Sequence, residues 1–305
     1  MKPIFLFIGL TLISLSCQLH AVEPANVQES ENSISMLWNG RILWRYNHDV
    51  GEGKPYFHPL ANADGRVFTD VRPKDHPWHR GLWHSWKFIN GVNYWEENRR
   101  TGLSDGKTSI TSFEHKISPD NTVELSLKLS YAPAADPRPL LSESRTITVS
   151  APDATGAYNI VWRSDFTALD QDLVLDRTPP TKEKAYAGYA GYSLRMTEEL
   201  KAGTFTNSDG LADAKAHAMP ARWMSHTSRL STTVVFMDHP GNFTFPSKWY
   251  VGLGTNYMSP AILYDEPYEL KAHQRLSLTY KVHVSSRALG QEEIEELWQS
   301  WTQPQ

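Results

Sequence analysis

The sequence has almost no cysteine and only one long apolar run. Among its 305 residues the single cysteine is Cys17. The apolar run covers positions 4–15 and follows Lys2, and its length of about 12 residues is well short of the roughly 20 that a membrane-spanning helix needs. We therefore do not expect a protein that is integral to the membrane.

The first 32 positions are typical of an exported protein. The charged start and short apolar core predict a signal peptide over residues 1–21, followed by a polar linker over 22–32. Cys17 would be removed with the signal, so the mature chain is expected to lack disulfides and thiolate chemistry. Lipidation of Cys17 is the alternative, but Ser14 stands where a lipobox has an aliphatic residue. A periplasmic or secreted protein is favoured over a lipoprotein.

The charge balance and the missing motifs exclude several function classes. The chain has 30 basic and 34 acidic residues, a net charge of −4, and no cluster of Lys and Arg, so nucleic acid is not an expected partner. It also lacks a phosphate-binding loop, a G-x-S-x-G nucleophile motif and a dinucleotide fingerprint. Nucleotide hydrolysis, serine-type hydrolysis and Rossmann oxidoreductase chemistry are therefore disfavoured.

Hydrophobic periodicity predicts an all-β fold. Apolar and polar residues alternate strictly over 123–130 and 275–284, as in half-buried antiparallel strands. Shorter strands are expected at 33–37, 41–46, 65–68, 109–117, 144–149, 158–166, 186–195, 232–237 and 261–264, separated by Gly, Pro, Asn and Asp turns. The one convincing helix covers 291–301 and should dock on the strands. We predict a single domain over 33–305, an antiparallel two-sheet β-sandwich with a C-terminal helix.

Chemistry-bearing residues concentrate in the segment DHPWHRGLW at positions 75–83. Pro77 and Gly81 break regular structure, which predicts an irregular loop on a rigid scaffold. Three interpretations of His76, His79 and His84 compete. The histidines brace the loop, or they perform acid/base catalysis with Asp75 as an orienting carboxylate, or they bind a divalent metal with Asp75. Acid/base catalysis is favoured for the loop as a whole, and no cofactor is expected, because H-x-x-H in a Pro-broken loop lacks helical metal-site geometry.

Aromatic residues add a signal for carbohydrate. With 11 Trp, 13 Tyr and 11 Phe, the chain can offer rings to the C–H face of a sugar. Trp83 and Trp86 cannot both point to one strand face, so at least one tryptophan of the set Trp78, Trp83, Trp86 and Trp95 is expected to line a cleft, and about half of the set is expected to pack in the core. The strand YAGYAGY at 186–192 carries three tyrosines, one of which could act as an acid or base.

Two segments further along the chain are candidates to join this loop. Asp238 and His239 follow an apolar run and precede Pro240, which predicts that their side chains emerge at the end of a strand. Arg222 lies next to Trp223 and is a second basic candidate. A surface turn remains an equal alternative for Asp238 alone.

The order of these motifs resembles a known family. YFHPL at 56–60, DHPWHRGLW at 75–83, ARW at 221–223 and DHP at 238–240 with Asn242 resemble exported bacterial proteins named "methane oxygenase PmoA". The similarity extends over about residues 33 to 285. A particulate methane monooxygenase subunit has several apolar spans, which this sequence lacks, so methane oxidation is not expected. The resemblance and the strand pattern suggest instead the supersandwich of galactose mutarotase-like domains, which present polar groups to a sugar.

These observations predict an exported enzyme that processes a carbohydrate or sugar derivative. His79 is predicted to transfer the proton, with His76 or His239 as its partner and Asp75 beside them. The residues predicted to bind substrate are Arg80, His58, Trp83, His84, Arg222 and Asp238. The alternatives are a non-catalytic glycan-binding module and a metal-dependent enzyme with histidine ligands.

Overall fold

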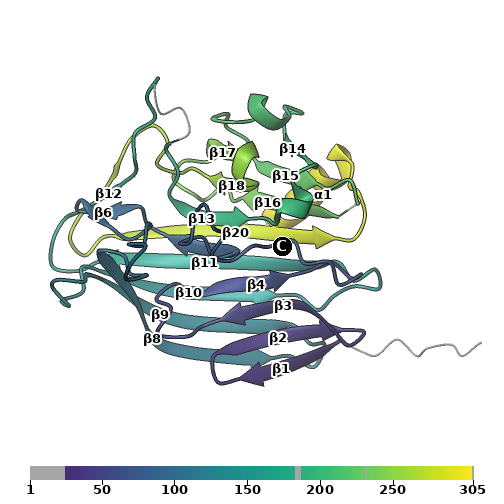
Figure 1. The fold of residues 1–305 in the computed structure, drawn as a ribbon, viewed down its shortest axis with the longest axis horizontal. Coiled ribbons are helices and arrows are strands. Elements are labelled where there is room, and N and C mark those ends of the chain that lie inside the picture. Colours follow the sequence, from purple (N-terminus) through teal and green to yellow (C-terminus); the bar gives the residue numbers. More distant parts are fainter. Residues whose placement is uncertain (1–24, 183–186, 231, 304–305) are drawn as a thin grey trace, which may run out of the picture.

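The computed structural model describes residues 25–182, 187–230 and 232–303. Two antiparallel sheets of eight strands face one another, with a four-stranded sheet beside them (Figure 1). Side chains of both large sheets meet in one core, where the rings of Phe57 and Trp162 lie 6.3 Å apart. This confirms the predicted antiparallel β-sandwich. The predicted signal peptide, residues 1–21, lies outside the described residues.

The first large sheet positions the site. Its strands, in spatial order, are β1 (Asn26–Ser30), β2 (Ser33–Trp38), β3 (Arg41–Asn47), β4 (Tyr56–Leu60), β5 (Leu82–Ser85), β13 (Gly191–Arg195), β18 (Tyr257–Pro260) and β17 (Trp249–Gly252). Strand β13 pairs with both β5 and β18, so three segments far apart in the sequence become neighbours. Strand β17 ends the order and is an edge strand.

The second large sheet has the more regular strands. In spatial order they are β14 (Thr204–Asn207), β15 (Trp223–Thr227), β16 (Thr233–Asp238), β20 (Arg275–Ser285), β11 (Tyr158–Ala168), β10 (Leu141–Val149), β9 (Val123–Pro133) and β8 (Gly106–Ile117). The alternation predicted at 123–130 is confirmed, because Val123, Leu125, Leu127 and Leu129 are buried and their neighbours are less so. One apolar face therefore sets the register of β9.

The smaller elements complete the molecule. The four-stranded sheet contains β19 (Tyr268–Leu270), β12 (Leu173–Asp176), β6 (Phe88–Ile89) and β7 (Val92–Asn93), and three 3₁₀ turns are η1 (Glu198–Leu200), η2 (Asp213–Lys215) and η3 (Leu253–Thr255). Helix α1 (Gln291–Thr302) confirms the predicted C-terminal helix and packs Ile294 against Trp223, Val235 and Met237. No helix in the described part of the chain is long and apolar enough to cross a membrane.

Three expectations about secondary structure were wrong. The predicted linker, 22–32, includes β1, which pairs with β2 along its whole length. Residues 65–68 form no strand, since Gly65 has a φ of +81° and only Val67 makes an isolated bridge. Residues 261–264 form a turn closed by a 2.9 Å hydrogen bond from the Tyr264 amide to the Ala261 carbonyl.

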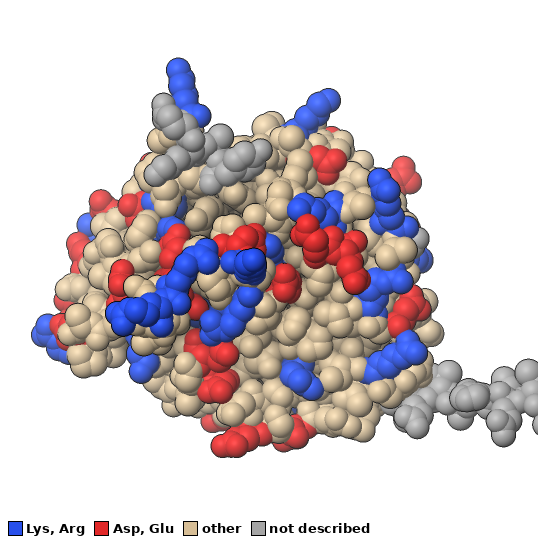
Figure 2. All heavy atoms as spheres, in the orientation of Figure 1, with Lys and Arg blue, Asp and Glu red and all other residues tan. Residues whose placement is uncertain are grey.

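Charges of both signs are mixed on the surface. Figure 2 shows Lys and Arg interspersed with Asp and Glu on one face, without a broad patch of a single sign. This view agrees with the small net charge of −4.

Candidate active site

The predicted loop exists and is rigidly held. It begins after Asp70, whose carbonyl accepts a 2.8 Å hydrogen bond from the amide of Gly81 at the other end. Gly81 has a φ of +66°, and a Cβ there would lie 2.4 Å from the Phe57 carbonyl oxygen. Only glycine therefore fits this close approach, which joins the loop to β4 and β5.

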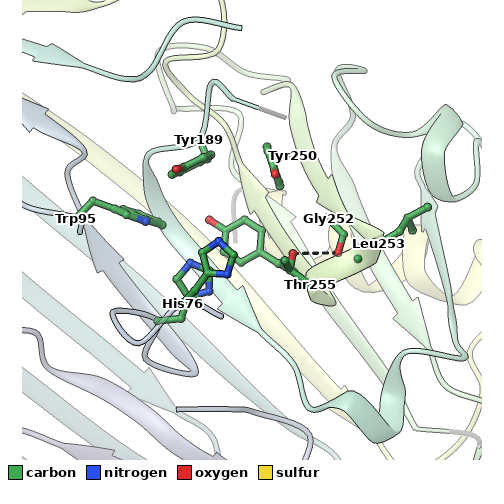
Figure 3. A pocket seen from close by; sticks show the side chains of 10 residues that line it. His76, Trp95, Tyr189, Tyr250, Gly252, Leu253 and Thr255 are labelled. Atoms are coloured by element: carbon green, nitrogen blue, oxygen red, sulfur yellow. Dashed lines mark hydrogen bonds between the residues drawn. The ribbon is translucent and has the colours of Figure 1, made fainter. Parts of the chain in front are cut away.

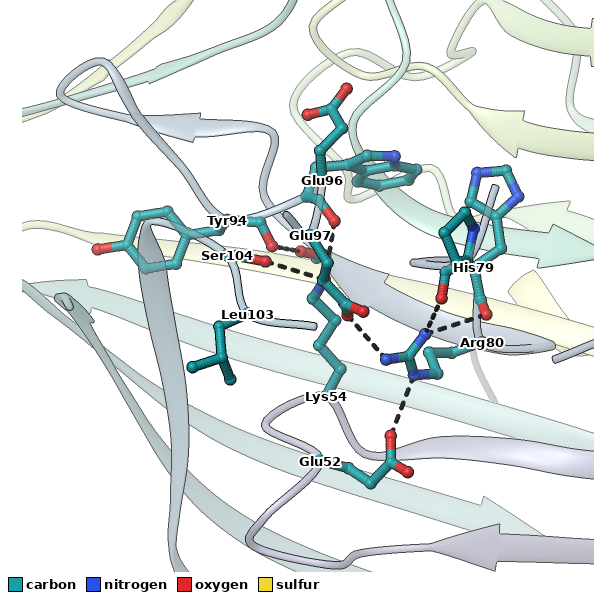
Figure 4. Close-up of polar contacts among 12 residues, drawn as sticks. Glu52, Lys54, His79, Arg80, Tyr94, Glu96, Glu97, Leu103 and Ser104 are labelled. Atoms are coloured by element: carbon teal, nitrogen blue, oxygen red, sulfur yellow. Dashed lines mark hydrogen bonds and ion pairs between the residues drawn. The ribbon is translucent and has the colours of Figure 1, made fainter. Parts of the chain in front are cut away.

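The buried side chain of Arg80 holds the loop in place. Its side chain is fully buried, and its guanidinium donates to Glu97 at 2.7 Å and to Glu52 at 3.2 Å (Figure 4). Further hydrogen bonds go to the carbonyls of Pro77 and His79 at 2.9 and 3.3 Å. Arg80 was predicted to bind substrate, but these contacts use its guanidinium to hold the loop. The sequence does not reveal that the carboxylates of Glu52 and Glu97 converge on Arg80.

His76 and His79 form a stacked pair of imidazoles. Their ring centroids lie 4.7 Å apart with an interplanar angle of 19°. His79 is only 5% exposed and rests against Trp83 and Tyr257, at 5.1 and 5.3 Å between ring centroids. Burial, reinforced by the nearby guanidinium of Arg195, holds the pKa of His79 well below its ordinary value. His79 is therefore neutral at neutral pH.

His76 is oriented by a carboxylate that is itself held by an arginine. The Nδ1 atom of His76 lies 2.9 Å from Asp75 Oδ2, and Arg195 Nη2 donates to both oxygens of Asp75 at 2.9 and 3.0 Å. Partial burial opposes the charged form, but the hydrogen bonds from His76 and Arg195 lower the pKa of Asp75 to about 2. Asp75 therefore stays ionised and accepts a hydrogen bond from Nδ1 of His76. The other ring nitrogen, Nε2, takes no part in this contact.

These imidazoles border a cavity of about 460 Å³. The residues that line it are His76, His79, Trp95, Tyr189, Tyr250, Gly252, Leu253, Gly254, Thr255 and Tyr257. Figure 3 shows Trp95, Tyr189 and Tyr250 arranged around the space that His76 borders. The Tyr189 hydroxyl accepts a 3.3 Å hydrogen bond from Lys87, which also contacts Glu96. The cavity therefore has aromatic walls, several hydroxyl groups and no carboxylate among its described lining residues.

Three predicted substrate-binding residues lie near the loop but outside this lining. Trp83 is buried beneath His79 and Trp95. His58 Nδ1 is 3.0 Å from Thr69 Oγ1. His84 is in the core between the sheets, where its ring contacts Trp86 and Phe166. Apart from His76 and His79, the lining comes from Trp95, from Tyr189 and from residues of β17, η3 and β18.

The downstream candidates do not join the site. The His239 ring contacts Trp301 of α1 at 5.1 Å, and Arg222 donates to Glu295 of the same helix at 3.1 Å. Asp238 is fully buried and accepts hydrogen bonds from Asn242 and the Ser247 amide. The predicted convergence of His239 with His79 was therefore wrong, because the end of β16 is covered by α1.

The tyrosines of the site were only partly predictable. Among the three singled out at 186–192, Tyr189 lines the cavity, Tyr192 is buried in the core and Tyr186 lies outside the described residues. No motif in the sequence marks Tyr250 and Tyr257 as site residues. They enter the site because β17 and β18 pair beside β13. Among the described residues no group of three His, Cys, Asp or Glu side chains is arranged to hold a metal ion.

The position of His84 predicts a loss of stability in acid. Burial lowers the pKa of His84 to about 3, and neither ring nitrogen has a partner among the described residues. The unfolded chain binds a proton near pH 6.5, so stability is complete above that pH and falls as the pH decreases toward 3. Between pH 6.5 and 4.5 this one group should cost about 2 kcal/mol.

His84→Leu tests this prediction, because leucine has a similar volume and does not titrate. The decrease in the free energy of unfolding between pH 7 and pH 4.5, measured with urea, should be smaller in the variant by about 2 to 3 kcal/mol. His273→Asn, at an exposed position with a φ of +63°, is the control and should behave like wild type. An unchanged pH dependence in His84→Leu would contradict the prediction.

Comparisons with solved structures show distant similarity. One is the alpha-galactosidase from Lactobacillus brevis, at 9% identity and a TM-score of 0.44, covering 88% of this chain and 40% of that one. A second is the galactosidase domain of alpha-galactosidase-sucrose kinase AgaSK, at 8% identity and a TM-score of 0.41, covering 86% of this chain and 40% of that one. A third is a Glycoside Hydrolase Family 97 enzyme from Pseudoalteromonas sp. strain K8, at 5% identity and a TM-score of 0.33, covering 86% of this chain and 34% of that one. The chain thus spans two fifths or less of these structures, and the likeness concerns the fold alone.

The sequence itself identifies a family. No curated protein matches the chain. Residues 33–299 match the model of a family of unknown function, DUF6807. Because this match covers most of the chain, including every strand after β1 and most of α1, the chain belongs to the family of unknown function DUF6807.

Proposed function

We propose that the protein is an exported carbohydrate-processing enzyme and that His76 transfers the proton in its reaction. One observation carries this proposal: His76, oriented by Asp75 and stacked on a buried neutral His79, borders a cavity with aromatic walls. A concave, aromatic-lined space with a few convergent polar groups is the usual form of a small-molecule site. Export follows from the signal peptide predicted at 1–21 and from the resemblance to the exported family named PmoA.

The cavity walls suit a sugar ring. The face of an aromatic ring carries partial negative charge and attracts the weakly positive C–H groups of a pyranose. Trp95, Tyr189 and Tyr250 offer such rings, while the hydroxyls of the tyrosines and of Thr255 offer partners for sugar hydroxyls. A sugar can thus satisfy both its apolar faces and its polar rim in this space.

His76 is better suited to proton transfer than His79, the residue favoured by the sequence alone. Asp75 accepts from Nδ1 of His76, which leaves the Nε2 lone pair of the neutral ring available as a base. His79 is deeply buried, and its lowered pKa disfavours a protonated intermediate. Its neutral ring supports His76 by stacking and adds no second positive charge when His76 becomes protonated.

The lining favours epimerisation or elimination over hydrolysis. Glycosidases ordinarily place two carboxyl groups across the scissile bond, whereas no carboxylate lines this cavity in the described part of the chain. A single imidazole base fits removal of a proton from a sugar carbon next to a carbonyl or carboxylate group. In elimination, the imidazolium that results returns this proton to the oxygen of the departing sugar as the C–O bond breaks; in epimerisation, a proton from solvent is added to the opposite face of the carbon. The Tyr189 hydroxyl accepts from Lys87 and is hydrogen-bonded to Glu96, so it can donate to the oxyanion that forms once it exchanges Glu96 for that oxygen.

A panel of glycans and uronic acid derivatives, incubated with the purified protein in D₂O, tests this proposal. We expect an epimer or an unsaturated sugar as product, and deuterium from solvent should appear in an epimer or in recovered substrate. Glycan binding without any product would instead support a non-catalytic binding module. Products of hydrolysis alone would overturn the assignment of His76 as a carbon base.

A further inference from the structure

A second cavity with aromatic walls lies close to the first and contains none of the residues of the proposed reaction. Its volume is about 470 Å³. Phe243, Tyr264 and Tyr268 line it together with Lys248 and Asp265. Phe243 is 39% exposed, an unusual fraction for so large an apolar side chain, and its ring lies 4.5 Å from that of Tyr268. The cavity thus offers exposed ring surface beside a charged pair.

Strand β17 connects the two cavities. Trp249 and Val251 point into the core, so the alternating positions Lys248, Tyr250 and Gly252 share the outer face of this edge strand. Lys248 lines the second cavity, and Tyr250 and Gly252 line the first. The nearest lining residues of the two cavities on this strand, Lys248 and Tyr250, are two positions apart, which is about 7 Å along an extended strand, so one ligand chain can reach both cavities.

Aromatic contacts continue between the cavities. The ring of His217 lies 5.1 Å from Tyr250, which lines the first cavity, and 6.3 Å from Tyr264, which lines the second. Strand β18 runs beside β17 and contributes in the same way, since Tyr257 lines the first cavity and Ala261, just after the strand, lines the second (Figure 1). Both cavities are therefore parts of one face of the β17–β18 hairpin.

We propose that the second cavity is a further subsite of the same binding site, so that the ligand is an oligosaccharide that runs along β17 from His76 to Phe243. This inference rests on the proposed function and specifies its substrate class. The exposed face of Phe243 stacks on a remote sugar residue, by the same attraction between a ring face and C–H groups as in the first cavity.

The polar residues of the second cavity complete this subsite. Lys248 Nζ contacts Asp265 at 2.5 Å and lies 5.3 Å from the centroid of the Tyr264 ring. The pair presents a donor and an acceptor next to aromatic surface, which matches the alternating hydroxyls and C–H faces of a sugar chain. A protein partner would need a larger apolar surface than one half-exposed phenylalanine with its neighbours.

Affinity measured as a function of chain length tests the proposal. The probes are fluorescently labelled oligosaccharides, from disaccharide to hexasaccharide, drawn from a panel of plant, algal and bacterial glycans. Wild type should bind the longest member of a preferred series more tightly than the disaccharide. Phe243→Ala should reduce this gain roughly fivefold to tenfold, the amount expected for one stacking contact. Ile117→Ala removes a similarly exposed apolar side chain from β8 and should leave both affinities as in wild type.

The outcomes separate this inference from the proposed function. If wild type gains nothing from chain length, or Phe243→Ala keeps the full gain, the second subsite is wrong although the His76 cavity still binds a sugar. If wild type binds no member of the panel, the proposed function and this inference fail together. Surface substitutions such as Phe243→Ala rarely change stability by more than about 0.5 kcal/mol, so loss of folding is not an expected outcome.

Discussion

Replacing His76 by alanine is expected to lower kcat of the sugar reaction by roughly 10²- to 10⁴-fold, the usual contribution of a general base. KM should change little, because Trp95, Tyr189 and Tyr250 still provide the walls that bind the sugar. Steady-state kinetics on the substrate found in the glycan panel measures both constants. Solvent deuterium should no longer enter the substrate, since the group that exchanges the proton is removed.

Three further variants make this result specific. Asp75→Asn removes the acceptor that orients His76 and should reduce kcat while the fold is kept, because Asp75 is partly exposed. His79→Phe keeps a flat ring beneath His76 and should lose less activity than His76→Ala. His115→Ala, at an exposed position on β8, is the control. A larger loss in His79→Phe than in His76→Ala would restore His79 as the proton-transfer residue.

The sequence predicted those elements that bury one face. Strands β9 and β20 and helix α1 were located because each has apolar residues at a constant period. Strand β1 was missed because four of its five residues are exposed, and pairing with β2 rather than burial makes it a strand. Short strands such as β17 and β18 are buried on several sides and leave no alternation to detect.

The site was predicted in part for a similar reason. The density of histidine, proline and glycine between Asp75 and Gly81 indicates an irregular loop, and the structure places His76 and His79 of that loop at a cavity. The opposite wall depends on the antiparallel order β5-β13-β18-β17, which joins residues more than a hundred positions apart. No local pattern encodes such a neighbourhood, so Tyr250 and Tyr257 could not be found from the sequence.

Buried polar residues account for the wrong assignments. Because Arg80 lies near two histidines in the sequence, it suggests a substrate-binding cation. In the structure its guanidinium forms ion pairs with Glu52 and Glu97 inside the protein. His84 likewise suggests a site residue, although its ring is enclosed by aromatic side chains. Since a chain of this size has room for a polar network inside its core, residue type alone does not separate a structural cation from a functional one.

The core contains one such network that should be costly to disrupt. Glu143 and Arg145 are both fully buried on β10, where Arg145 donates to the two oxygens of Glu143 at 2.7 and 2.9 Å. Ser164 and Tyr131 also donate to this carboxylate, and Arg145 lies 4.6 Å from the centroid of the Trp162 ring. Every oxygen of Glu143 is therefore engaged, and its charge is balanced by one cation.

Arg145→Met is expected to lower the free energy of unfolding by about 3–5 kcal/mol at pH 7, because it leaves Glu143 as a buried carboxylate without a cation. Urea denaturation measures this difference. Loss of the cation raises the pKa of Glu143, so protonation relieves part of the penalty, and the difference from wild type should shrink as the pH falls from 7 toward the ordinary glutamate pKa of about 4.5. Replacing both residues, as Glu143→Leu with Arg145→Met, should cost less than Arg145→Met alone, since no unpaired charge then remains.

The neighbouring strand provides a matched control for burial. On β11, Arg163 donates to both oxygens of Asp165 at 2.9 and 3.0 Å, with the same spacing of two residues along a strand. Its side chain is 55% exposed, whereas that of Arg145 is 0% exposed. Arg163→Met should therefore cost no more than about 1 kcal/mol, because an ion pair with a largely exposed arginine contributes little and Ser277 still donates to Asp165. If Arg145→Met were equally mild, the buried pair would not be the charge-balanced network that its geometry indicates.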